Sequence, residues 1–236
     1  MTNIAAVARR ELGAYFNSPI AYIVATLYLV LSGALYFPEL FLGGQADLRG
    51  FFGLAPILFS ILVPVLTMRL VAEEKSQGTL ELLLTMPVTD WEVVLGKYFA
   101  AVGLIAIVIL LTVPFALSVG SLGPLDKGAT FAGYFGMLLM GATFAAIGLM
   151  CSAFSKHQIV AFIIAFSIGF PLVIIASMIQ VMPHWLAPIV SAISMQTHFT
   201  NVARGVIDTR DLLYYLSMIG GSLVIAQASL ESRRWR

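Results

Sequence analysis

Residues 93–120 read VVLGKYFAAVGLIAIVILLTVPFALSVG, and Lys97 is the only charged residue among them. A helix that crosses a bilayer needs about 20 consecutive, mostly apolar residues, so this stretch is long enough to span a membrane. Lipid cannot form hydrogen bonds with the backbone, and a single segment of this kind must therefore be helical. The stretch thus predicts a membrane protein that is built from helices.

Five further stretches meet the same criterion of length and apolar composition. Together with the first they give six predicted spans: Pro19 to Leu42, Phe51 to Val71, Val93 to Gly120, Phe131 to Phe154, Ile159 to Val181, and Leu212 to Leu230. The 236 residues are 60% hydrophobic and 11% charged, whereas soluble domains carry about 25% charged residues. We therefore predict an all-α, polytopic membrane protein with a single domain over residues 1–236.

Lysine and arginine are unevenly distributed between the two sides that six spans define. If the N-terminus is cytoplasmic, nine of the 13 basic residues lie on the cytoplasmic side: Arg9, Arg10, Arg69, Lys75, Lys97, Lys156, Arg233, Arg234 and Arg236. The other four are Arg49, Lys127, Arg204 and Arg210. Because cytoplasmic loops carry an excess of Lys and Arg, we predict that both termini are cytoplasmic.

Residues 1–18 have the pattern of an amphipathic helix that lies on the membrane surface. One stripe at helical spacing holds Ile4, Val7, Ala8, Leu12, Tyr15 and Phe16, and the opposite face holds Arg9, Arg10 and Gly13. Glu11 falls inside the apolar stripe. Two interpretations of Glu11 remain open: its carboxylate reaches solvent or caps another group, or it contacts a neighbouring cytosolic element.

The connection between the second and third predicted spans is acidic. It holds five of the 12 acidic residues, against Lys75 as its single basic residue: Glu73, Glu74, Glu81, Asp90 and Glu92. A loop that met only anionic lipid would gain from basic residues instead. Thr79 can cap a short leucine-rich helix that ends at Pro87, and Thr89 begins the next helix. We predict that residues 73–90 meet a partner; the alternative is an interfacial helix on lipid.

Two other segments suggest contacts without naming a partner. Gly141, Ala145 and Gly148 form a ridge of small residues in the fourth span, which permits close helix packing within one subunit or between two. Residues 182–210 are expected outside the cytoplasm, with a short amphipathic helix from Met195 to Val206. This segment is either a gate or lumen cap, or an inert interfacial loop.

Several kinds of site are absent from the sequence. It contains no G-x-x-x-x-G-K-[ST], H-E-x-x-H or G-x-S-x-G motif, so we expect neither nucleotide binding nor enzymatic activity by this chain. His157, His184 and His198 fall on opposite sides of the predicted membrane, which argues against a metal site. A net charge of +1 argues against a nucleic-acid partner. No acidic residue lies at mid-membrane, which argues against ion-coupled transport.

Eight stretches carry a family resemblance: RELGAYFNSP at 10–19, PVLTMRL at 64–70, AEEK at 72–75, GTLELLLTMPVTDWE at 78–92, HF at 198–199, RGVID at 204–208, DLLYYL at 211–216 and LESRRWR at 230–236. With them the chain resembles the permease subunits of type-two ABC exporters. It is most similar to the gliding-motility-type (GldF-like) permeases, which are akin to NosY-type permeases.

This resemblance implies an ATP-driven export machine in the bacterial inner membrane, whose ATPase is a separate subunit. Residues 73–90 would be the coupling helix that docks on an ATPase dimer through Glu73, Glu74, Gly78, Thr79, Leu80, Glu81, Leu82, Leu83 and Pro87. The N-terminal helix, with Arg10, Glu11, Tyr15 and Phe16, would be the connecting helix beside it. ATP and magnesium would bind the ATPase, so that this chain itself holds no cofactor.

The resemblance also implies further partners. A second permease copy or a homologue would flank a central path, and a larger accessory membrane protein can accompany permeases of the gliding type. An alternative output follows from that type: a mechanical or scaffolding complex that moves a periplasmic partner and transports no solute.

Overall fold

The computed structural model describes residues 3–43, 46–78, 89–179, 181–206 and 208–234. These residues form helices and connecting turns, with no strand in the described ranges. The helices are α1 (Asn3–Asn17), α2 (Pro19–Gly43), α3 (Arg49–Thr67), α4 (Arg69–Gln77), α6 (Asp90–Leu110), α7 (Val113–Leu122), α8 (Lys127–Phe154), α9 (Gln158–Met178), α10 (Ala187–Ile193), α11 (Met195–Ala203) and α12 (Thr209–Arg234). The predicted all-α class is confirmed.

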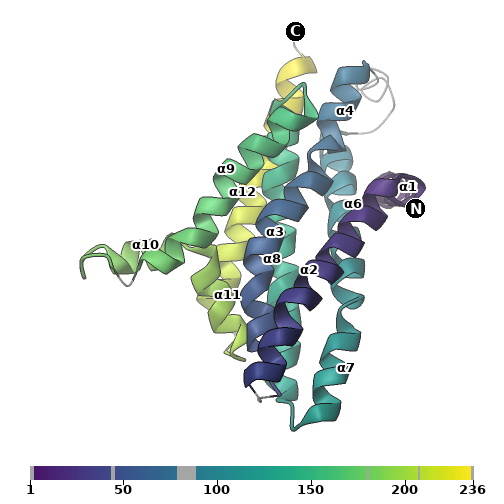
Figure 1. The fold of residues 1–236 in the computed structure, drawn as a ribbon. Helices are drawn as coiled ribbons and strands as arrows, with labels where there is room; N and C mark the ends of the chain where they lie inside the picture. The colour runs from purple at the N-terminus through teal and green to yellow at the C-terminus, as the bar shows by residue number, and fades with distance from the viewer. Residues whose placement is uncertain (1–2, 44–45, 79–88, 180, 207, 235–236) are drawn as a thin grey trace.

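Six helical segments of the described chain are long and apolar enough to cross a membrane, which confirms the predicted spans. They are α2, α3 continued by α4, α6 continued by α7, α8, α9 and α12. The spans form one elongated bundle (Figure 1). Two of them are interrupted: at Met68, four residues after Pro64, and at residues 111–112, just before Pro114. Proline removes a backbone donor and crowds the preceding turn, which favours such breaks.

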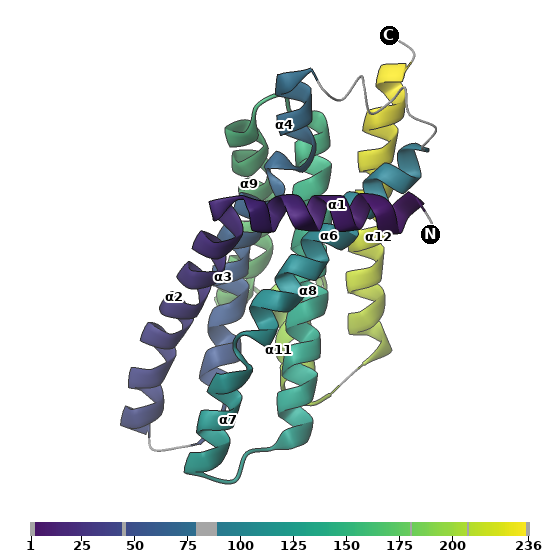
Figure 2. The ribbon, with the colours of Figure 1, turned by 90° about the vertical axis from the view of Figure 1, so that its right-hand side faces the viewer.

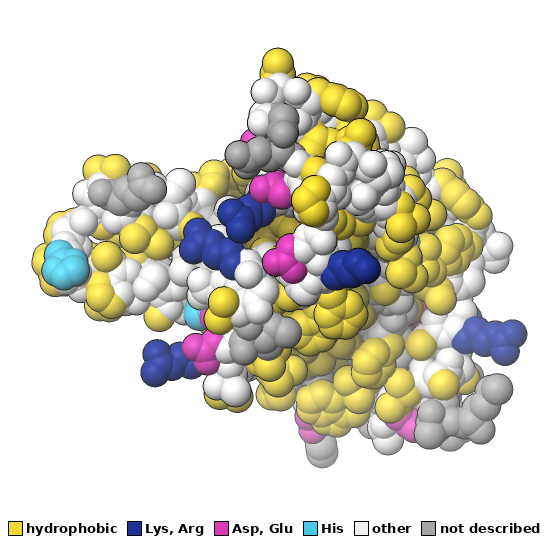
Figure 3. Space-filling view, turned by 90° about the horizontal axis from the view of Figure 1, so that it is seen from below, with side chains coloured by type: hydrophobic (Ala, Val, Ile, Leu, Met, Phe, Trp, Pro, Cys, Tyr) yellow, Lys and Arg dark blue, Asp and Glu magenta, His cyan; other side chains and the backbone are white. Residues whose placement is uncertain are grey.

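The two ends of the bundle differ in what they carry. The C-terminus and α4 lie at one end, and the connections from α2 to α3 and from α7 to α8 lie at the other (Figure 1). Figure 3 views this second end, where basic and acidic side chains lie among broad hydrophobic surfaces. The arrangement agrees with six spans that alternate in direction.

Helix α8 is the centre of the bundle, because 78% of the residues in its most apolar stretch are buried. Its glycines allow neighbouring helices to approach closely. An added Cβ at Gly141 would lie 2.7 Å from Ile105 of α6, and one at Gly148 would lie 2.8 Å from the Thr67 Cβ of α3. The ridge of small residues therefore packs against other helices of the same chain.

Helix α1 runs across the direction of the spans, against α6 (Figure 2). The crossing is close because α6 has Gly96 there: an added Cβ would lie 2.6 Å from Val7 of α1. A crosswise helix with one apolar face is typical of helices at a membrane surface. The position of α1 relative to lipid remains a prediction.

Residues 182–206 form two short helices next to α9 and α12, and α10 projects to the side of the bundle (Figure 1). The predicted helix from Met195 to Val206 ends earlier, at Ala203. Gly205 has φ +90°, a left-handed conformation that side chains rarely adopt and that ends helices. This boundary prediction was therefore wrong by three residues.

Replacing Gly148 with alanine should loosen the contact between α3 and α8, because the added methyl would overlap Thr67. We expect a loss of about 1–3 kcal/mol in the free energy of unfolding, as for other overpacked cores. The matched control is Gly221→Ala in α12, where an added Cβ meets nothing within 4 Å. Thermal unfolding in detergent measures both, and equal melting temperatures for the two variants would contradict the packing described.

Candidate functional site

Lys97 lies two turns into α6 and is almost completely buried, with 1% of its side chain exposed. The start of α6 is fixed by a capping box. Thr89 Oγ1 accepts from the Glu92 amide at 3.4 Å, and Glu92 Oε2 accepts from the Thr89 amide at 2.9 Å. The helix start predicted at Thr89 is thereby confirmed. With this start, Lys97 faces α1 and α4 and does not reach solvent.

The Lys97 ammonium is paired with two carboxylates from other helices. Its Nζ donates to Glu74 Oε1 of α4 at 2.7 Å and to Glu11 Oε1 of α1 at 3.1 Å. Arg10 completes the group, with its guanidinium 3.0 Å from Glu11 Oε1 and 3.8 Å from Glu74 Oε1. We call Arg10, Glu11, Glu74 and Lys97 the charge cluster.

The charge cluster is partly shielded from water. The side chains of Glu11 and Glu74 are 15% and 20% exposed. Burial opposes ionisation of Glu11, but the positive charges of Lys97 and Arg10 outweigh it and hold the pKa of Glu11 below its usual value. A buried ammonium is costly unless it is paired, so Lys97 needs these carboxylates. Of the two interpretations of Glu11, contact with a neighbouring element describes the structure.

The cluster lies at the base of the predicted docking segment. Glu74 belongs to α4, which ends at Gly78 with φ +72°, and Lys97 belongs to α6, which begins at Asp90. Glu73 is half-buried and Gly78 is exposed. The other predicted docking residues lie outside the described residues: Thr79, Leu80, Glu81, Leu82, Leu83 and Pro87. The charge cluster thus joins the two flanks of residues 79–88 to each other and to α1.

A second set of contacts fixes the C-terminal end of α1. The buried Tyr15 hydroxyl donates to the Leu66 carbonyl of α3 at 2.9 Å. The Arg69 guanidinium stacks over the Tyr15 ring at 4.7 Å and donates to Ser18 at 3.1 Å. Phe16 packs edge-on against Tyr22, with the ring centroids 6.0 Å apart. Leu66 before the α3–α4 break therefore contacts α1, and Arg69 after the break contacts both α1 and Ser18.

Ser152 of α8 secures the start of α4. Its hydroxyl accepts from the amides of Val71 and Ala72, each at 3.0 Å, and donates to the Met68 carbonyl at 2.9 Å. The first amides of a helix have no partner within it, so this hydroxyl replaces missing backbone bonds. Lys75 donates to the Ala153 carbonyl at the end of α8. Helix α4 is therefore attached to the buried centre of the bundle.

A separate polar group lies among α10, α11 and α12. His198 Nδ1 is 2.5 Å from Asp211 Oδ1, and Nε2 is 3.2 Å from the Ala192 carbonyl. The His198 ring stacks on Tyr214, whose hydroxyl donates to the Ile193 carbonyl. Among the described residues no group of three or more His, Cys, Asp or Glu side chains could hold a metal ion. The contacts of His198 instead connect the short helices to α12.

Lys97 has no sequence signature of a site residue. A lysine near the end of a span commonly extends to the membrane surface, so its position alone gave no signal. The acidic residue within the apolar stripe of α1 was the one available hint that a buried cation lay opposite.

Replacing Lys97 with methionine should remove the buried cation between Glu11 and Glu74 and leave these carboxylates with the more exposed Arg10. We expect a loss of about 2 kcal/mol in the free energy of unfolding, somewhat below the 3–5 kcal/mol of fully buried pairs because both carboxylates keep some exposure. Neutralising all three residues, as Glu11→Gln, Glu74→Gln and Lys97→Met together, should restore most of it. Lys156→Met, at an exposed lysine, is the control; a melting temperature equal to that of Lys97→Met would contradict the pairing.

Comparison with known proteins assigns the chain to a family. Residues 4–228 match the ABC-2 family transporter protein family. The probable multidrug ABC transporter permeases YbhR of Escherichia coli strain K12 and of Escherichia coli O157:H7 are each 30% identical to this chain over 154 residues. The match covers 64% of this chain and 41% of each relative, so it spans less than half of their length. The chain is a membrane-spanning protein of the ABC-2 transporter family.

Proposed function

We propose that this chain is the permease subunit of an ATP-driven ABC exporter, and that a separate ATPase docks on residues 73–90. The charge cluster is the observation that carries the proposal. A docking segment can drive the spans only if its base is firmly attached to them. Lys97 provides that attachment on both flanks, through Glu74 on α4 and through its own helix, α6.

The same contacts suggest how a stroke at residues 73–90 would spread. Movement of α4 would be passed to α8 through Ser152 and to α1 through the charge cluster. Because α1 crosses α6 at Gly96, its displacement would in turn tilt α6. The spans that contain α4, α6 and α8 would thus all respond to one movement of residues 73–90. Packed helices transmit such shifts because interiors are close-packed.

The orientation and location belong to the same proposal. The ATPase would act from the cytoplasm, so α4 and both termini would be cytoplasmic and the protein would lie in the bacterial inner membrane. The excess of Lys and Arg on that side supports this orientation. The relatives are described as probable multidrug permeases; a multidrug substrate range for this chain is a proposal by analogy with them.

A second permease subunit is also part of the proposal. The outward faces of α2 and α9 carry large, exposed apolar side chains, among them Ile23 (60% exposed), Val30 (58%), Ile159 (71%) and Ile163 (53%). Either lipid or a second copy can cover such faces.

The gliding-motility subtype, with a mechanical output and a larger accessory protein, rests on sequence resemblance, and no described contact favours it over transport.

The docking assignment is tested by co-purification with a co-expressed ABC ATPase subunit from the same organism. Glu81→Arg combined with Leu83→Asp should reduce recovery of the ATPase at least tenfold, because the changes reverse a charge and place a carboxylate in the predicted leucine-rich docking helix. Because the ATPase is cytoplasmic, this loss would also assign residues 73–90 to the cytoplasmic side.

The matched control makes the same kinds of change at the opposite end of the bundle. Val206 and Asp208 are both exposed between α11 and α12, so Val206→Asp with Asp208→Arg should leave ATPase recovery unchanged. Equal recovery with wild type and with the Glu81/Leu83 variant would overturn the docking assignment.

A further inference from the structure

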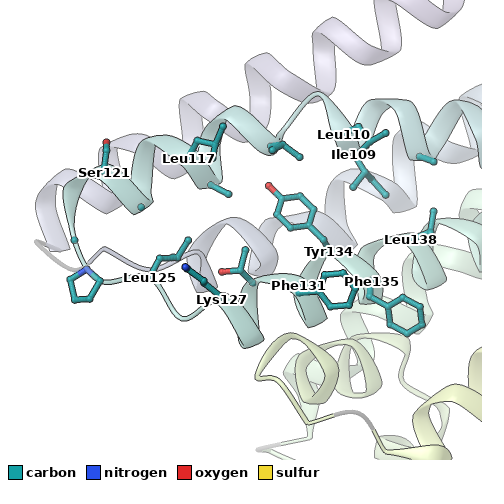
Figure 4. A pocket seen from close by; sticks show the side chains of 17 residues that line it. Ile109, Leu110, Leu117, Ser121, Leu125, Lys127, Phe131, Tyr134, Phe135 and Leu138 are labelled. Carbon is teal, nitrogen blue, oxygen red and sulfur yellow. The ribbon is translucent and has the colours of Figure 1, made fainter.

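A large apolar cavity lies between α7 and α8, at the end of the bundle away from α4. Its volume is about 1220 Å³. Ile109, Leu117, Phe131, Tyr134 and Leu138 are among the side chains that line it (Figure 4). Three of the large apolar lining residues are strongly exposed, Leu110 at 65%, Leu117 at 69% and Phe131 at 73%. The cavity is therefore open to the surroundings of the bundle, which for a membrane span are lipid.

The cavity exists because the third span bends where α6 passes into α7. Thr112 Oγ1 donates to the Ile109 carbonyl at 2.6 Å, and Tyr134 Oη donates to the Thr112 carbonyl at 3.1 Å. These bonds satisfy polar groups that the break would otherwise leave open. The break is therefore stable in an apolar environment, and the walls beside it remain almost entirely hydrocarbon.

The cavity has the dimensions of one leaflet. Its lining on α8 runs from Lys127 to Leu138, which at about 1.5 Å per residue is about 16 Å. The hydrocarbon core of a bilayer is about 30 Å thick, so the cavity is about half as deep as the core. An extended acyl chain that enters from the nearer surface would fit this depth.

The shallow end of the cavity carries a positive charge. Lys127, the first residue of α8, is exposed. It is the only charged residue among the described residues that line the cavity. The neighbouring Asp126 is engaged elsewhere: its Oδ1 accepts from the amides of Gly128 and Ala129 at 2.9 and 3.2 Å and caps α8. The ammonium of Lys127 therefore lies where the head group of a lipid would be, above apolar walls.

We propose that the cavity between α7 and α8 binds one acyl chain of an anionic phospholipid whose phosphate pairs with Lys127. The occupant follows from charge complementarity and depth: a positive charge at the surface end, hydrocarbon below it, and the length of one leaflet. A basic side chain at the level of the head groups attracts the phosphate of an anionic lipid by the same electrostatics that hold such lipids at basic pockets on the cytoplasmic side. The site would hold a structural lipid against the bend of the third span, and it does not depend on the docking of an ATPase.

Native mass spectrometry of the purified protein with dioleoylphosphatidylglycerol or dioleoylphosphatidylethanolamine tests the site. Wild type should retain the anionic lipid about fivefold better, which is the effect expected of one lysine near the surface. Lys127→Gln should reduce this ratio to about one. The matched control, Lys156→Gln, removes an exposed lysine outside the cavity lining and should leave the ratio unchanged.

A second variant tests the cavity itself. Gly120 lines the cavity, and an added Cβ there meets only the Leu125 side chain, at 3.9 Å. Gly120→Phe should therefore fill part of the space and reduce retention of both lipids, with little change in melting temperature. Equal retention of the two lipids by wild type, or an unchanged ratio in Lys127→Gln, would overturn the proposal. So would a Gly120→Phe variant that alters the ratio of monomer to dimer while it retains lipid normally, since a second copy would then be the occupant.

Discussion

A buried ammonium group must be neutralised by nearby negative charge, and Lys97 imposes this requirement on one end of the bundle. Its Nζ lies within 3.1 Å of carboxylates from both α1 and α4. Removing a charge from water costs several kcal/mol, and only close pairing offsets that cost. The position of α1 across α6 and the position of α4 beside it are therefore linked by one interaction. Residues 79–88 connect to the bundle through the two helices that this interaction joins.

The polar side chains around the α3–α4 break meet a related requirement. A bend inside an apolar bundle exposes amides and carbonyls that lipid cannot satisfy. Ser152 satisfies two amides and one carbonyl at the break, and Tyr15 satisfies the Leu66 carbonyl. These side chains come from α8 and α1, so the break between α3 and α4 is also a point where both of these helices are attached. The charge cluster and the break together make this end of the bundle a connected unit.

The features that sequence predicted correctly are local ones. Six apolar stretches give the spans because hydropathy needs no knowledge of the fold. The helix start at Thr89 follows from a capping box over four residues. The partner of Glu11 could not be predicted from a local pattern, since Lys97 is 86 positions away in the sequence. The pairing of His198 with Asp211 depends on a turn that follows the end of α11 at Ala203. The sequence pattern predicted that this helix continues to Val206, so the turn was missed. The role of residues 79–88 rests on resemblance, because they lie outside the described residues.

The most direct test of the charge cluster is a double-mutant cycle on Lys97 and Glu74, which measures their interaction apart from other effects of each change. Free energies of unfolding in detergent are compared for Lys97→Met, Glu74→Gln and the double variant. If the pair fixes α4 to α6, the double variant should be less destabilised than the sum of the single variants, by at least about 1 kcal/mol. Additivity within about 0.3 kcal/mol would contradict the central role of this interaction.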